Sequence, residues 1–309
     1  MATCLSHFNH KANFLSKSKW SSKTNYKPRR IIAAAQNKSA YWASIEADID
    51  TYLKKAIPVN SPASVVGPMH HLIFAAPRTG AAALCVAACE LVGGDRRQAM
   101  AAAAAVHLMH AAAYTHEHLP LMKTGRPGPE PEIEHKYSPG IELLIGDGLI
   151  PLGLGLLAGS FLDRTRNDPD RIVRVMVEIT RAVGSQGAVA GLYRKLGATD
   201  GNYYDYEVME YVCRKRDGEL HGCGAACGAV LGGGAEEEVE KLRKFGVYAG
   251  MVRGLTAAAA AAAEKNHGVD LEGKIEEIKE LAMMELKGLR GREIELISSL
   301  AMFFKLSRG

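Results

Sequence analysis

The stretch that decides the fold is HLMHAAAYTHEHLP, residues 107–120, which lies in an alanine-rich part of the chain. Alanine has the highest helix propensity of any residue, so residues 98–115 predict a helix. The segment GGDRR before it predicts a turn that separates it from another alanine-rich helix at residues 79–92. The quoted stretch closes with Glu117 and His118, a carboxylate and an imidazole side by side.

Helical periodicity extends through the rest of the chain. In YWASIEADIDTYLKKAI, residues 41–57, apolar side chains recur every four residues, which is typical of an amphipathic helix. Pro58, Pro62 and Pro68 predict a break after this helix, and four prolines in residues 123–140 predict a loop. Further helices are expected at residues 142–162, 169–183, 205–231 and 235–263, with one or two more in residues 271–305.

Composition agrees with this pattern. Hydrophobic residues make up 47% of the chain but aromatic residues only 6%, so the apolar content is mainly aliphatic and favours packed helices. No strand pattern longer than a few residues occurs. We therefore expect a single all-α domain of about ten helices at residues 39–309. The longest apolar stretches are rich in alanine and glycine and shorter than a bilayer span, so no membrane span is expected.

The first 38 residues differ in composition from the rest. They contain no Asp or Glu and eight Lys or Arg residues interleaved with serines, which is typical of an organelle transit peptide. A basic arm that binds nucleic acid is the alternative. Without this segment, 30 Lys and Arg stand against 34 Asp and Glu, a net charge of −4, so the overall +4 gives no reason to expect a nucleic-acid partner. We predict a disordered plastid leader at residues 1–38.

Residues 107–120 resemble the trans-isoprenyl diphosphate synthases, in which a helix of the form xIHxxxLIHDDLP ends in the first of two aspartate-rich motifs. The flanking segments CELVGG, residues 89–94, and LLIGDGLIPLGLGLLAG, residues 143–159, agree with the same family. The resemblance implies an all-α isoprenoid-synthase fold. It also implies a site in which aspartates on facing helices hold Mg²⁺ and basic residues hold the substrate diphosphates.

Both aspartate pairs are replaced at the matching positions. Glu117 and His118 stand in the first motif, and imidazole is a poor ligand for magnesium, which prefers oxygen. The segment EEEVEKLRKFGVYAGMVRG, residues 236–254, resembles the sequence before the second motif, but Ala257 and Ala258 replace its aspartates. We therefore expect this chain to bind no metal ion or other cofactor, to have no working pocket and to be inactive alone.

The basic residues that hold the second substrate are also largely replaced. Arg78 takes the place of a lysine, and the arginine pair that follows it in the family is lost. In a later helix, Arg216 and Asp217 replace a Lys-Thr pair, and Asp217 would repel a diphosphate. Arg126 is a candidate to replace one lost basic residue. The resemblance thus leaves a vestigial substrate site made of Arg78, Glu117, His118 and Arg126.

Two CxxxC elements, at residues 85–89 and 223–227, place each cysteine pair one turn apart on a helix face. A shared metal site fits this pattern, and so does a role as small core residues. A disulfide within either helix does not fit, because Cβ atoms at i and i+4 lie about 5–6 Å apart. Four histidines have HxxH and HxH spacings, but helix-face histidines are more often packed or solvated than ligands. We assign no metal to any of them: His107, His110, His116 and His118.

A narrower resemblance covers most of residues 41–295. Segments such as MHHLIFAAP, HAAAYTHEHLPL and YVCRKRDGELHGCGAACGAVLGGGAEEEVEKLR are similar to the small subunits of plant heteromeric geranyl diphosphate synthases. This resemblance implies a non-catalytic subunit that pairs with a geranylgeranyl diphosphate synthase-like large subunit, which carries the Mg²⁺. The residues implied in the contact with that partner are Cys85, Cys89, Cys223 and Cys227.

The function implied by this resemblance is to bind the large subunit, as a heterodimer or heterotetramer in the plastid stroma, and to direct it toward geranyl diphosphate (C10) for monoterpenes. The loop at residues 123–140 is predicted to touch the mouth of the partner's pocket. Two alternatives stay open. One is a stabilising or activating subunit that raises geranylgeranyl diphosphate output, and the other is a self-sufficient prenyltransferase with atypical metal ligands.

Overall fold

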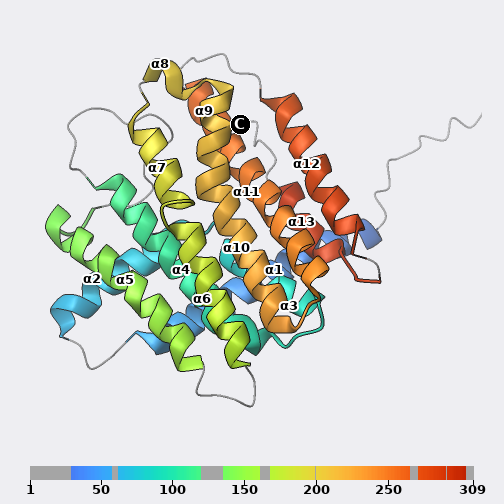
Figure 1. Cartoon of the computed structure of the whole chain (residues 1–309), viewed down its shortest axis with the longest axis horizontal. Coiled ribbons are helices and arrows are strands. Elements are labelled where there is room, and N and C mark those ends of the chain that lie inside the picture. Colours follow the sequence, from blue (N-terminus) through green and yellow to red (C-terminus); the bar gives the residue numbers. More distant parts are fainter. Residues whose placement is uncertain are drawn as a thin grey trace, which may run out of the picture. The chain divides into compact units, whose positions relative to one another are not determined.

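The computed structural model describes residues 29–57, 62–119, 135–160, 168–198, 200–264, 271–289 and 291–303. The chain divides into two units, residues 1–37 and residues 38–309, and most of the described residues belong to the second. Every regular element in this described part is a helix, which confirms the predicted all-α class. In chain order (Figure 1) the elements are α1 (Arg29–Ala56), α2 (Ala63–Ala75), α3 (Ala81–Leu91), α4 (Arg96–His118), α5 (Pro139–Ser160), α6 (Pro169–Val183), α7 (Ala188–Leu196), α8 (Asp200–Tyr203), α9 (Tyr206–Cys213), the π-helical turn η1 (Arg214–Gly218), α10 (Glu219–Gly232), α11 (Glu236–Glu264), α12 (Glu272–Lys287) and α13 (Glu295–Phe303).

The core of the second unit is built around three helices with small side chains, α3, α4 and α10. Nearly all of α3 and α10 and most of α4 are buried. Helices without a polar face are stable only where neighbours cover them on all sides. Here α5 packs on α4, α6 packs on α10, and α11 covers α10 with Gly246 and Val247 at the contact. The alanine-rich segments are therefore the centre of the fold.

Glycines let α10 approach α3 to backbone contact. A Cβ atom added at Gly228 would lie 1.9 Å from the carbonyl oxygen of Cys85, and one at Gly224 would lie 2.3 Å from that of Ala81. Real Cβ atoms do not approach a carbonyl so closely, so a larger residue would separate the two helices. The small residues of α10 are therefore required by packing.

The π-turn η1 lies where the sequence predicted an uninterrupted helix, residues 205–231. The chain runs on through α9, η1 and α10, and the turn carries Arg216 and Asp217. Such turns are rare and occur frequently at functional sites. A Cβ atom at Gly250 of α11 would lie 2.2 Å from the carbonyl oxygen of Asp217, so α11 also approaches η1 closely through a glycine.

Three other predictions about helices need correction. Helix α1 begins at Arg29, so residues 29–38, predicted as disordered leader, are helical, in keeping with the three alanines at residues 33–35. Pro68 does not break the chain but lies inside α2, where it costs one backbone hydrogen bond. The short helices α7 and α8 were not predicted, because neither is long enough to show clear periodicity.

Two predicted segments lie mainly outside the described residues. Residues 1–28 contain most of the predicted leader, and residues 120–134 contain most of the predicted loop together with Arg126. The roles given to them stay predictions.

Two helices, α5 and α11, are long and apolar enough to cross a membrane by length and composition alone, although the sequence predicted no such segment. Core helices of soluble proteins pass the same test, and 61% of the relevant window of α11 is buried inside the protein. For α5 the buried share is only 33%. The apolar surface that α5 leaves uncovered therefore needs an explanation.

Candidate functional site

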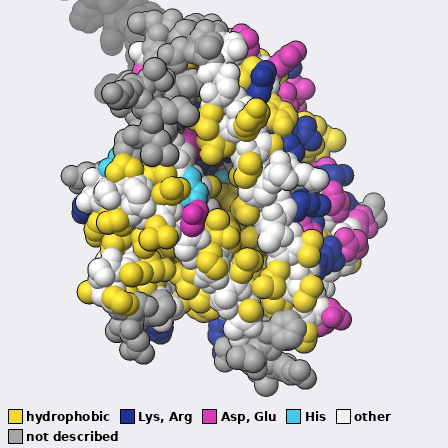
Figure 2. Space-filling view, turned by 60° about the vertical axis from the view of Figure 1, so that its left-hand side comes forward, with side chains coloured by type: hydrophobic (Ala, Val, Ile, Leu, Met, Phe, Trp, Pro, Cys, Tyr) yellow, Lys and Arg dark blue, Asp and Glu magenta, His cyan; other side chains and the backbone are white. Residues whose placement is uncertain are grey.

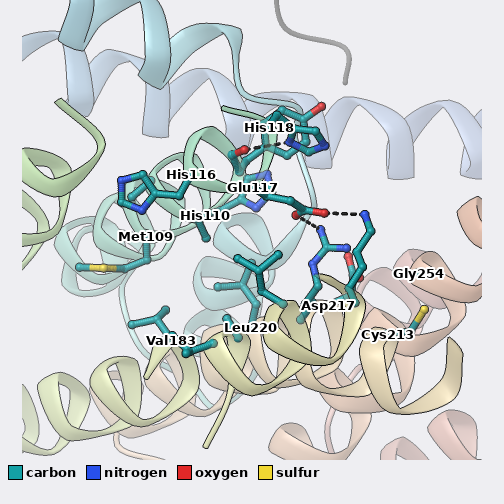
Figure 3. A pocket seen from close by; sticks show the side chains of 18 of the residues that line it. Met109, His110, His116, Glu117, His118, Val183, Cys213, Asp217, Leu220 and Gly254 are labelled. Atoms are coloured by element: carbon teal, nitrogen blue, oxygen red, sulfur yellow. Dashed lines mark hydrogen bonds and ion pairs between the residues drawn. The ribbon is translucent and has the colours of Figure 1, made fainter. Parts of the chain in front are cut away.

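The segments that match the two aspartate-rich motifs line one cavity of about 300 Å³. Glu117 and His118 reach it from the last turn of α4 (Figure 3). Ala257 and Ala258 line it from α11. Residues of α5, α6, α7, α8, α9, η1 and α10 also line the cavity. A cavity therefore persists where the two motif segments meet, and the expectation that it is not a working substrate pocket stays a prediction.

The carboxylate of Glu117 is buried and bound to two cations. Its Oε1 accepts a hydrogen bond from the Nζ of Lys195 at 2.6 Å, and its Oε2 lies 2.7 Å from an Nη of Arg216. Burial alone would raise the pKa of Glu117, but Arg216 and Lys195 outweigh it and lower that pKa to about 2. Glu117 is therefore ionised and held between α7 and η1.

The π-turn extends this ion pairing to α11. Asp217 follows Arg216 in η1, and its Oδ1 accepts a hydrogen bond from Arg253 at 2.7 Å. Gly254 makes room for the Asp217 carboxylate, since a Cβ atom there would lie 2.9 Å from Oδ2. A chain of ion pairs thus joins α4 to α11 through η1. These are the two helices that a metal clamp joins in the family suggested by the sequence.

This arrangement does not fit a magnesium clamp. Both oxygens of Glu117 already contact cations, and Ala257 and Ala258 offer no ligand atom. In the described part of the chain, no group of three or more His, Cys, Asp or Glu side chains is placed to hold a metal ion. The internal cations occupy the carboxylate that a metal would need.

The histidines of α4 bond to backbone carbonyl groups. His118 bonds through Nδ1 to the carbonyl oxygen of Tyr114 at 2.8 Å, and His110 bonds through Nε2 to that of Pro77 at 3.0 Å. Burial lowers the pKa of His118 and, more strongly, that of His110, so both rings are neutral at pH 7. His107 likewise bonds the carbonyl oxygen of Ile73 at 2.8 Å. These rings have a packing role.

Arg78 lies apart from this ion-pair chain. Its guanidinium group contacts Asp50 and lies 3.8 Å from Glu46, both on α1, and 3.2 Å from Nε2 of His107. The neighbouring Pro77 lines the cavity. Arg78 therefore fastens the loop before α3 to α1, and its part in a vestigial substrate site stays a prediction.

The four CxxxC cysteines are buried at the contacts of α3 and α10. The exposed fraction is at most 4% for each, and the Sγ atoms of Cys223 and Cys227 lie 3.7 Å apart as free thiols. Burial raises the pKa of Cys85 well above its ordinary value and that of Cys89 to about 12, so these thiols are protonated. Within this chain they are small packing residues, and the contact with a partner that the resemblance implies for them stays a prediction.

A second candidate site is an apolar surface on α5 and α6, which pack beside each other. Figure 2 shows hydrophobic side chains gathered over this side of the protein. The most exposed are Leu144 at 69% and Val177 at 60%. Contiguous apolar surface of this kind marks an interaction site in soluble proteins. We call it the α5–α6 face, defined by Ile141, Leu143, Leu144, Val173 and Val177.

Sequence reasoning missed Lys195, Arg253 and the α5–α6 face. Lys195 lies on the unpredicted α7, so its contact with Glu117 had no signal in the sequence. The α5–α6 face did have a signal in the sequence. Val173 and Val177 lie one turn apart on α6 and point away from the buried Val175 and Ile179. A helix that is apolar on two faces needs a second neighbour.

Comparison with known proteins agrees with these observations. No family model matches the chain. The structure is similar to that of the geranyl diphosphate synthase small subunit from Antirrhinum majus, with a TM-score of 0.76 and 56% identity over 86% of this chain and 98% of that one. It is also similar to a deletion mutant of the heterotetrameric geranyl pyrophosphate synthase from mint, with a TM-score of 0.72 and 54% identity over 85% and 98%.

The fold that the structure shares with these two proteins defines an isoprenyl-diphosphate-synthase-type helical protein. Among curated sequences, the heterodimeric geranylgeranyl pyrophosphate synthase small subunit 2, chloroplastic, of Cannabis sativa is 46% identical over 89% of this chain and 96% of its own length. The chain belongs to the family of small subunits of heteromeric geranyl and geranylgeranyl diphosphate synthases. The relative's chloroplastic name supports a plastid location for this chain as well.

Proposed function

We propose that this chain is the non-catalytic small subunit of a heteromeric prenyl diphosphate synthase in the plastid stroma. It binds a geranylgeranyl diphosphate synthase-type large subunit and directs that enzyme toward geranyl diphosphate. Mg²⁺ and both substrates bind the large subunit. Residues 1–38 serve as the transit peptide and residues 39–309 as the functional domain.

The observation that carries this proposal is the state of Glu117. Magnesium would have to compete with Lys195 and Arg216 for this carboxylate, and breaking a buried ion pair costs about 3–5 kcal/mol. The facing Ala257 and Ala258 have no ligand atom that would compensate for this cost. Catalytic ionisation of an allylic diphosphate depends on the electrostatic stabilisation that is lost here.

The α5–α6 face supplies the surface for association with the large subunit. Five large apolar side chains on two adjacent helices are exposed in the single chain. The mint relative is described as heterotetrameric, so a protein of this fold assembles with other subunits. The four cysteines also contribute to association with the partner, and their burial between α3 and α10 supports a contribution through the shape of these packed helices.

A second candidate function is favoured by one observation. The Cannabis relative is named for a geranylgeranyl rather than a geranyl product, so the chain is alternatively a subunit that raises C20 output. Product analysis of a large subunit with and without this chain separates the two. A shift from C20 to C10 supports the first proposal, and a faster reaction with an unchanged C10 to C20 ratio supports the second. No association and no effect would overturn both.

A further inference from the structure

The cavity beside Glu117 has a charged end and an apolar end. Figure 3 shows Glu117 and Asp217 on one side, and Met109 and Val183 on the other. Pockets that bind small molecules commonly combine an apolar wall with a few converging polar groups. The arrangement therefore fits a ligand with a polar head and a hydrocarbon tail.

The charged end carries one more cation than anion. Lys195, Arg216 and Arg253 line the cavity together with only two carboxylates, those of Glu117 and Asp217. The other ionisable groups of this end are neutral: burial lowers the pKa of His110 and His118 and raises that of Tyr203 and Cys213. At the opposite end, His116 lies 3.3 Å from Asp147. Three cations therefore share two carboxylates, and a bound anion would balance the remaining positive charge in this partly buried site.

The excess charge faces the cavity on two guanidinium groups. Side chains of Arg216 and Arg253 are 25% and 24% exposed, and both line the cavity. Each guanidinium has five N–H donors, and the ion pairs with Glu117 and Asp217 engage one nitrogen of each. A planar fork of this kind suits a carboxylate or a phosphate.

We propose that this cavity binds an amphipathic anion, a carboxylate or phosphate monoester on a short hydrocarbon chain, without a metal ion. The head bonds Arg216 and Arg253, and the tail lies between Met109, Val183 and Leu220. No metal is required because arginine, rather than Mg²⁺, neutralises the head. Such a ligand would make the non-catalytic subunit a binding protein in its own right.

Calorimetric titration of the full chain at pH 7 in the presence of a chelator tests this proposal. The probes are octanoate, octyl phosphate, octan-1-ol and octyltrimethylammonium, which share one tail and differ in the head. We expect one molecule of octanoate or octyl phosphate per chain, at least tenfold weaker binding of the alcohol, and no binding of the cation. Whichever anion binds more tightly identifies the head group.

Variants separate the cavity from the outer surface. Arg216→Met leaves Glu117 paired with Lys195 and removes the excess charge, so the anion should bind at least tenfold more weakly. Val183→Trp fills the apolar end and should abolish binding, whereas Leu144→Ser on the α5–α6 face should change nothing. If Arg216→Met fails to fold, the comparison of octanoate with octan-1-ol on the unchanged chain decides.

Equal binding of the anion and the alcohol, unaltered anion binding by a folded Arg216→Met variant, or binding only when Mg²⁺ is added would each overturn the proposal. The titration needs no large subunit. Its failure would therefore leave the proposed function intact, and failure of the proposed function would not affect its result.

Discussion

Replacement of Glu117 by glutamine is the perturbation with the largest expected effect on the folded subunit. The change keeps the size of the side chain but leaves Lys195 and Arg216 without their shared carboxylate. Breaking a buried ion pair by removing one partner costs about 3–5 kcal/mol. The pKa of Glu117 gives a similar figure, because a shift from 4.5 to about 2 corresponds to about 3 kcal/mol.

This contribution has a defined pH dependence. The pKa of Glu117 is lower in the folded chain than in the unfolded one, so its stabilisation is complete above about pH 5 and is lost as the pH falls through 4.5 toward 2. At pH 4 the loss amounts to about 1 kcal/mol. The free energies of unfolding of the unchanged chain and of Glu117→Gln should therefore differ most near pH 7 and approach each other in acid.

Urea denaturation at pH 7, 5 and 4 measures this difference. Glu236→Gln is the matched control, because Glu236 forms a solvent-exposed pair with Arg174 and its loss should leave the free energy of unfolding almost unchanged. Equal stability of Glu117→Gln and the unchanged chain at pH 7 would refute the reasoning. So would a difference that stays constant between pH 7 and pH 4.

Three further predictions concern catalysis, association and the cysteines. The double variant Glu117→Asp, His118→Asp should not allow the isolated chain to condense isopentenyl diphosphate with dimethylallyl diphosphate, because Ala257 and Ala258 still lack ligand atoms. Product formation in an assay that contains Mg²⁺ would contradict this prediction. Leu144→Ser with Val177→Ser should weaken binding to the large subunit at least tenfold, or about 1.4 kcal/mol, in a titration of the two subunits, without changing the urea midpoint of the single chain. Cys85→Ser should lower the free energy of unfolding by about 1–3 kcal/mol because it buries a hydroxyl group. Binding to the large subunit should weaken only as far as this loss of stability explains. Weaker binding at unchanged stability would instead show direct contact of the thiol with the partner.

Much of the fold was predictable because most of its helices carry a regular signal. The alanine-rich runs and the four-residue spacing of Ile45, Ile49 and Leu53 place helices close to where they occur. The π-turn was not predictable, since a change in hydrogen-bond pattern within a helix leaves no mark in composition. Yet this turn places Arg216 and Asp217 between α4 and α11.

In the candidate site, the replaced motif residues were predictable from the sequence, but the new ion pairs were not. Aligned motifs indicated that Glu117 and Ala257 face each other, and the structure confirms that both line one cavity. The partner of Glu117 could not be foreseen, because Lys195 is 78 residues away in the chain and lies on a helix without clear periodicity. Contacts of this kind depend on tertiary packing, which a single sequence does not reveal.

The most direct test of a non-catalytic role uses a complex in which only this chain is left intact. A large subunit whose first aspartate-rich motif is changed to alanine is assembled with this chain, and prenyl diphosphate formation is measured with Mg²⁺ and both substrates. We predict a stable complex with no product above background, and full activity when the unchanged large subunit is used. Sustained product formation by the complex with the disabled large subunit would contradict the central claim.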